Sequence, residues 1–126
     1  MENSPKTGTT HKFERTVNPD LCIQFDGLPP VLSTPHLIWL LEECSMELIE
    51  PFLVDDEMTL GTHVDVEHLG PALTGDVVTF QATVIQASGR EILCRVEATL
   101  LETTLARGLH RRTVVSRSRL AKRLLR

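Results

Sequence analysis

Apolar residues recur three and four positions apart between residues 34 and 50, and this spacing predicts one long amphipathic helix. Thr34 stands where a helix N-cap is expected, Pro35 would then be the first helical residue, and Pro51 ends the pattern. The rest of the cylinder carries four glutamates, Glu42, Glu43, Glu47 and Glu50. Such a set usually forms the solvated face of a helix, although one of the neighbours Glu42 and Glu43 can point toward a sheet.

Beyond Met58 the period of the pattern changes from 3.6 to two residues, which predicts β-strands. The alternation runs through residues 58–68, 78–84, 92–100 and 107–115, and a shorter strand is expected around 13–17. Residues 88–90, Ser-Gly-Arg, predict a hairpin turn between the second and third long strands. One face of the first long strand is expected to carry Leu60, Thr62, Val64, Val66 and His68.

A short strand, one long helix and a run of antiparallel strands are typical of an α+β domain in which a curved sheet wraps around the helix, as in the hotdog fold. We expect this domain at residues 12–116, after a flexible lead-in at 1–11 and before a basic tail at 117–126. A single helix leaves the edge strands of such a sheet open. We therefore expect a homodimer, and pairing of dimers into a tetramer is a further option.

Composition and charge narrow the class of protein. The chain has 126 residues, enough for one domain, and its 4% of aromatic residues is too few for the stacking platforms of single-stranded nucleic-acid binders. The net charge of -4 is unevenly distributed, because residues 107–126 hold eight of the 13 Lys and Arg residues and none of the 17 acidic ones. Three widely spaced cysteines, no apolar leader and no run of about 18 apolar residues predict a cytoplasmic protein without a membrane span.

Candidate chemistry rests on a few polar residues, because motifs for phosphate loops, dinucleotide binding, acyl-serine hydrolases and zinc proteases are absent from the sequence. His68 continues the inward face of Val64 and Val66, so its imidazole is either a paired core group or a general acid or base. Glu42 follows Thr34 by eight residues, a rise of about 12 Å along a helix. These two side chains can border one groove but cannot touch.

Two further charged sets have less specific interpretations. His63, Asp65 and Glu67 share the outward face of their strand, but no second cluster completes a metal site, so we expect a hydrated strand face and no metal. The C-terminal segment contributes Arg111, Arg112, Arg117, Arg119, Lys122, Arg123 and Arg126. These cations could contact the phosphates of a nucleic acid, an anionic membrane or a nucleotide-bearing ligand, or simply be solvated. Leu120 and Leu124, four residues apart, indicate a short amphipathic helix in this tail.

Several of these residues together carry a resemblance to a known family. They are the run from Val31 to Pro35 (Val-Leu-Ser-Thr-Pro), Glu42 eight positions after Thr34, the run 60–64 (Leu-Gly-Thr-His-Val), His68 seven positions after Gly61, and the run 108–112 (Gly-Leu-His-Arg-Arg). In this order and spacing the sequence resembles the hotdog-fold acyl-CoA thioesterases of the fluoroacetyl-CoA thioesterase type. The resemblance covers residues 12–116.

The resemblance implies a site and a reaction. Thr34, Glu42 and His68 match the catalytic threonine, glutamate and histidine of the family, and Gly61 matches the glycine whose backbone approaches the thioester. Either Glu42 and His68 activate water, or Glu42 attacks directly to form an acyl anhydride, while Thr34 orients the carboxylate or the thioester oxygen. Arg112 and the neighbouring tail arginines would pair with the phosphates of CoA, and no cofactor is implied.

The chain departs from the family pattern in the segment before the helix. Fluoroacetyl-specific members have an aromatic lid there, where this sequence offers Phe25 and Leu28 as substrate-binding residues, followed by two prolines. We therefore do not expect fluoroacetate as the acyl group. Two alternatives stay open: a hotdog module that binds acyl-CoA or a related ligand without catalysis, and nucleic-acid association through residues 107–126. The acidic character of the remaining chain argues against the second.

Overall fold

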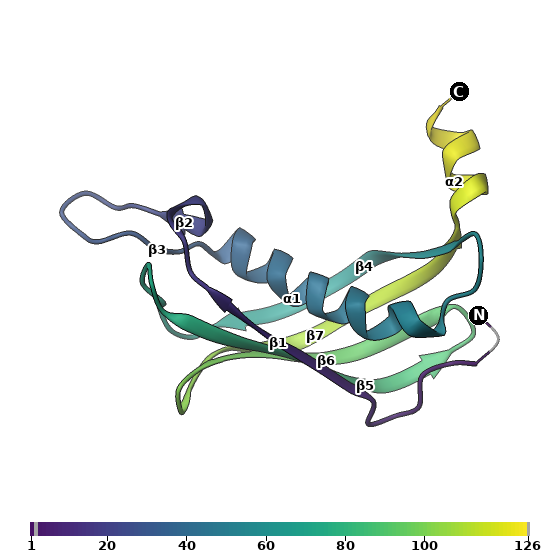
Figure 1. Cartoon of the computed structure of the whole chain (residues 1–126), viewed down its shortest axis with the longest axis horizontal. Coiled ribbons are helices and arrows are strands. Elements are labelled where there is room, and N and C mark those ends of the chain that lie inside the picture. Colours follow the sequence, from purple (N-terminus) through teal and green to yellow (C-terminus); the bar gives the residue numbers. More distant parts are fainter. Residues whose placement is uncertain (2, 126) are drawn as a thin grey trace.

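An antiparallel five-stranded sheet wraps around one long helix (Figure 1). The computed structural model describes residues 1 and 3–125, so Arg126 of the predicted basic tail lies outside the described residues. The sheet has the order β1-β5-β6-β7-β4. Its strands are β1 (Thr10–Thr16), β4 (Glu57–His68), β5 (Val77–Ser88), β6 (Glu91–Leu100) and β7 (Thr103–Ser116), and the helix is α1 (Thr34–Ile49).

The smaller elements lie at the two ends of α1. A two-stranded hairpin of β2 (Cys22–Ile23) and β3 (Val31–Leu32), preceded by the 3-10 turn η1 (Pro19–Leu21), leads into the helix. The 3-10 turn η2 (Glu50–Phe52) follows the helix, and α2 (Arg117–Leu124) follows β7. In Figure 1 the β2–β3 loop extends beyond the beginning of α1, and α2 stands out from the opposite end of the sheet.

The core forms where the apolar stripe of α1 meets the inner face of the sheet. Leu37, Leu41, Cys44 and Leu48 are buried on the helix at intervals of three and four residues. The inner face contributes alternate buried residues of β5 and β6, namely Val78, Phe80, Ala82, Val84, Ile92, Cys94, Val96 and Ala98. The helix, the strands and the hairpin turn between β5 and β6 agree with the sequence pattern.

The predicted N-cap of α1 and the predicted first residue of β7 were both wrong. Ser33, not Thr34, is the N-cap of α1, and its side chain accepts a hydrogen bond from the backbone N–H of His36 at 3.3 Å. Thr34 is already inside the helix. Strand β7 begins at Thr103 rather than near 107, because Leu101 adopts a φ of 55° and turns the chain tightly between β6 and β7.

The face assignment of β4 is also wrong in its first half. A β-bulge between Gly61 and His63 shifts the register against β7, so the alternation changes phase within the strand. Gly61 faces α1 together with Val64, which pairs with the buried His110. Leu60 and Thr62 therefore lie on the opposite face, away from the inward residues Val64, Val66 and His68.

The cysteines are free thiols in the described part of the chain. Cys44 and Cys94 are buried, and burial raises the pKa of the first to about 12 and of the second to about 11. Such thiols are inert packing groups. Cys22 is partly exposed. Neither described helix has the length and apolar character needed to cross a membrane.

Candidate active site

A hydroxyl and an imidazole meet where α1 begins and β4 ends. The Thr34 Oγ1 atom lies 2.7 Å from Nδ1 of His68. Because Ser33 caps the helix, the Thr34 hydroxyl is not needed at the N-terminal backbone and remains available to the imidazole. Thr34 is exposed and His68 half-buried, so this pair is accessible to a small molecule from solvent.

Two helical turns further on, the Glu42 carboxylate lies directly over Gly61 of β4. A Cβ atom built on Gly61 would come within 2.6 Å of Glu42 Oε1 and within 3.0 Å of His110 Cε1. Real Cβ atoms essentially never approach another atom that closely, so glycine at this position lets the carboxylate lie where it does, and any larger residue would displace it. The Glu42 side chain is 32% exposed, and it is therefore held against the sheet yet open to solvent.

His110 supplies a neutral imidazole beside this carboxylate. Arg112 Nη1 lies 3.2 Å from His110 Nε2 and can only donate, so Nε2 accepts and Nδ1 carries the proton. Nδ1 then donates to the backbone oxygen of His63 at 2.9 Å. Burial lowers the pKa of His110, which favours this neutral form. Glu42 Oε1 lies 3.8 Å from Nε2, too far for a hydrogen bond.

Arg112 is a buried cation that faces Glu42 from the sheet. Its Nε donates to Thr59 Oγ1 and its Nη2 to the Thr59 backbone oxygen, both at 2.9 Å. Only 6% of the residue is exposed. A cavity of about 270 Å³ lies between α1 and Arg112, lined by Trp39, Glu42, Glu43, Met46 and Arg112. Within one chain, the guanidinium that we expected to bind CoA phosphates is directed inward and lines the Glu42 side of the site.

The structure thus brings the expected site residues together in two groups. Thr34 contacts His68. Glu42 contacts Gly61, with His110 and Arg112 beside them. Among the described residues, no hydrogen bond or ion pair joins Glu42 to Thr34 or His68, as the helical rise between Thr34 and Glu42 predicts. Phe25 and Leu28 lie in the loop of the β2–β3 hairpin and are 52% and 57% exposed.

Sequence reasoning did not assign His110 and Arg112 to the neighbourhood of Glu42. Their spacing of two residues places both on one face of β7, and a polar pair on the inner face of a central strand is a recognisable signal. Which α1 residue they meet depends on the β4–β7 register and its bulge. The arrangement offers a carboxylate, a hydroxyl–imidazole pair and a buried cation, groups that can serve acyl transfer to water as a base, a hydrogen-bond donor and an electrostatic stabiliser.

Comparison with solved structures gives the class of the fold. The structure of the fluoroacetyl-CoA thioesterase FlK superposes with a TM-score of 0.91 at 23% identity, over 98% of this chain and 97% of that one. A protein of the thioesterase superfamily from Thermus thermophilus superposes with a TM-score of 0.89 at 26% identity, over 99% and 93% of the two chains. The predicted α+β hotdog fold is confirmed.

Sequence comparison gives the family. The model of the fluoroacetyl-CoA-specific thioesterase family matches residues 14–118. A fluoroacetyl-CoA thioesterase from Streptantibioticus cattleyicolor is 30% identical over 105 residues, which make up 83% of this chain and 75% of that protein. The chain belongs to the fluoroacetyl-CoA-specific thioesterase family. It is therefore a thioester hydrolase that acts on acyl-CoA, as the family resemblance implies.

Proposed function

We propose that this thioesterase hydrolyses its acyl-CoA substrate with Thr34, Glu42 and His68, beside the backbone of Gly61. One observation carries the proposal: a hydroxyl–imidazole pair, Thr34 Oγ1 to His68 Nδ1 at 2.7 Å, lies on the same helix–strand seam as the Glu42 carboxylate over Gly61. Both groups line the contact between α1 and β4, so a thioester bound along this seam would meet all three side chains.

The roles follow from the chemistry of each group. Glu42 takes a proton from water, the water oxygen bonds to the thioester carbon, and the C–S bond breaks. The proton returns to the CoA sulfur, and the acyl group leaves as the free acid. Direct attack by Glu42, followed by hydrolysis of the acyl anhydride, is the other route for the same carboxylate. The Thr34–His68 pair polarises the thioester oxygen, and the neutral His110 leaves Glu42 without a competing hydrogen bond.

We propose that the acyl group is apolar and is not fluoroacetyl, which is the substrate named for the relatives. Phe25 and Leu28, with large exposed apolar surfaces, are presented by the β2–β3 hairpin beyond the start of α1 (Figure 1). A side chain of that size exposed in a loop gains by covering an apolar ligand. The two residues would cover the acyl chain when substrate binds.

A cytoplasmic homodimer is the working state that we propose. Strand β4 is an edge of the sheet, which among the described residues pairs with β7 alone, and its run from Leu60 to Asp65 is exposed on both faces. An open edge of this length favours pairing with a second copy. Three free cysteines, two of them buried, suit a reducing compartment.

The test is thiol release from a panel of acyl-CoAs of increasing chain length, with Glu42→Gln as the decisive variant. Glu47→Gln is the matched control, because Glu47 is a glutamate of the same helix that pairs with His11 Nε2 at 3.1 Å and does not line the cavity beside Arg112. We expect Glu42→Gln to lose at least about 100-fold in kcat and Glu47→Gln to stay near wild type. Saturable binding of acyl-CoA with no thiol release from any ester would instead support the non-catalytic binding module.

A further inference from the structure

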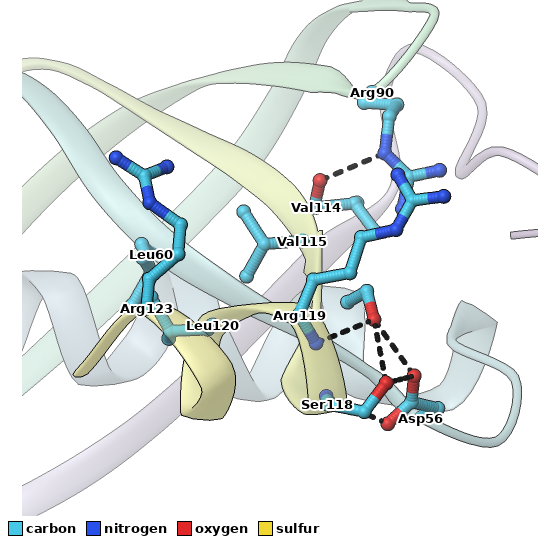
Figure 2. Close-up of a pocket in the computed structure, with 10 residues that line it drawn as sticks. Asp56, Leu60, Arg90, Val114, Val115, Ser118, Arg119, Leu120 and Arg123 are labelled. Atoms are coloured by element: carbon cyan, nitrogen blue, oxygen red, sulfur yellow. Dashed lines mark hydrogen bonds between the residues drawn. The ribbon is translucent and has the colours of Figure 1, made fainter. Parts of the chain in front are cut away.

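A second cavity lies at the junction of β4, β7, the β5–β6 turn and α2, away from the residues that contact Glu42. Its volume is about 730 Å³, within the range of cavities that bind small molecules. Figure 2 shows it with the apolar side chains of Leu60, Val115 and Leu120 between arginines from two parts of the chain. Its lining contains Arg90, Arg119 and Arg123.

These arginines are brought together by an anchored helix. Asp56 fixes the first turn of α2: its Oδ1 accepts from the Ser118 backbone N–H at 2.9 Å, and its Oδ2 accepts from the hydroxyls of Ser116 and Ser118 at 2.7 and 2.8 Å. These hydrogen bonds lower the pKa of Asp56 and keep it ionised. The Asp56 carboxylate therefore has its hydrogen-bond donors in the serines at the beginning of α2.

Arg90, Arg119 and Arg123 carry like charges that repel one another, and Figure 2 draws Arg123 on the other side of the apolar side chains from Arg90 and Arg119. Arg119 and Arg123 are four residues apart on α2, a spacing at which like charges destabilise a helix. Arg90 reaches the same cavity from the β5–β6 turn, where its Nε donates to the Val114 oxygen at 2.9 Å and its Nη2 lies 3.7 Å from Glu57. The guanidinium groups of Arg90 and Arg119 line the same cavity, and two such groups favour an anion with several oxygens, such as a phosphate.

The apolar side chains of the cavity define the rest of the ligand. Leu60, Val115 and Leu120 offer a surface on which a planar base can pack, and guanidinium groups also stack on aromatic rings. We propose that this cavity binds a phosphorylated nucleotide, with the phosphates on Arg90 and Arg119 and the base against the apolar side chains. The nucleotide end of acyl-CoA and a free nucleotide share this chemistry, and the first source rests on the proposed function.

The position of the cavity relative to Glu42 bears on whether the nucleotide belongs to acyl-CoA or is a free molecule. Leu60 is next to Gly61 in β4, but the two residues point to opposite faces of the strand. The cavity and the Glu42 carboxylate therefore lie on opposite faces of β4. A nucleotide bound in the cavity either belongs to a CoA ester that passes from one face of the sheet to the other or is a separate molecule.

Binding is measured first, without any reaction. Adenosine 3′,5′-bisphosphate is titrated into the full chain by calorimetry, with adenosine as the phosphate-free comparison. We expect Arg119→Glu to weaken binding of the bisphosphate at least about tenfold, and Arg119→Gln to weaken it less. Lys122→Glu is the matched control, because it makes the same charge change on the same helix outside the cavity lining. The proposal is overturned if the wild type does not bind the bisphosphate, or if Lys122→Glu weakens binding as much as Arg119→Glu.

Kinetics then identify the source of the nucleotide. The same variants are assayed on an acyl-CoA and on the matching N-acetylcysteamine thioester, which has no nucleotide. If CoA supplies the ligand, Arg119→Glu raises KM for the CoA ester only. If a free nucleotide supplies it, KM is unchanged for both esters while bisphosphate binding is lost. Hydrolysis of neither ester by the wild type would refute the proposed function, whereas bisphosphate binding that depends on Arg119 would still support the cavity proposal.

Discussion

Gly61 leaves just enough room for the Glu42 carboxylate, and this fit can be tested with a single methyl group. In Gly61→Ala the new Cβ would come within 2.6 Å of Glu42 Oε1, so the carboxylate must move away from β4. We expect kcat to fall about 100-fold, because a displacement of about 1 Å has that effect on catalysis. Gly70→Ala is the control, since its Cβ would meet only Leu105 at an ordinary 3.4 Å. Equal kcat in both variants would contradict the fit.

The neutral His110 makes the stability of the fold depend on pH. Its pKa in the folded state is lowered by burial, so the unfolded chain binds a proton first as the pH falls. Stability contributed by the neutral form is therefore present above the unfolded pKa of about 6.5 and is lost as the pH falls below it. We expect the Tm to decrease between pH 7 and pH 5.

His110→Asn separates this effect from other titrations. Asparagine can still donate to the His63 oxygen but does not titrate, so the variant is expected to show a smaller decrease in Tm over the same interval. If His110→Asn and the wild type have the same pH dependence, His110 is not the group responsible.

The candidate site shows what could be predicted from the sequence at this scale. Thr34 and His68 were expected near one site on the strength of a family resemblance, and the structure pairs them. Arg112 was expected at a phosphate but lies buried against Thr59. The sequence shows that residue 112 is a cation, but it does not show which way its side chain points. Only the register of β4 against β7, with the bulge at Gly61, decides which side of the sheet it faces.

At the scale of the elements, the beginning of α1 holds both the residue that caps the helix and a residue of the candidate active site. Ser33 caps the helix and also contacts His36 Nδ1 at 2.7 Å, and the next residue is Thr34. We expect Ser33→Ala to destabilise the fold by about 1 kcal/mol, because a cap is lost, and to lower kcat as the first turn frays. Ser88→Ala, at the exposed end of β5, is the control. The prediction is checked by urea denaturation and fails if the two variants are equally stable.

Periodicity predicted the elements better than their ends and faces. The long helix and the four long strands follow from spacings of 3.6 and two residues, which are local properties. The phase of β4 was wrong because a bulge inserts one residue without a mark in the local pattern. The start of β7 was missed because Leu101, an apolar residue, occupies the left-handed turn where glycine or asparagine is the usual signal.

At the scale of the whole molecule, the distance between the two groups of site residues along α1 indicates how a substrate would be oriented. Thr34 and His68 lie at the beginning of α1, while Glu42 lies two turns further along, beside Arg112. The β2–β3 hairpin lies next to the beginning of α1 (Figure 1). An acyl-CoA bound along the helix would place its acyl chain toward Phe25 and Leu28. Closure of the site over such a ligand needs a second surface along β4, which a partner copy would provide.

The open edge of β4 leads to the last prediction. Thr62 lies near the middle of this strand, is exposed and faces away from α1, so Thr62→Lys leaves the core of one chain and the surroundings of Glu42 intact. A lysine in an edge strand opposes pairing with another strand, because the charge must be desolvated at the interface. We expect the wild type to have a mass in solution twice the 14.1 kDa of one chain, and the variant to have the mass of a single chain. Val77→Lys, with an exposed valine at the start of β5, is the control and should stay dimeric.

Light scattering coupled to gel filtration measures all three masses, and a monomeric wild type would refute the proposed dimer. Since catalysis is proposed to need the covered edge, the loss of dimer in Thr62→Lys should bring a parallel loss of thiol release at equal Tm.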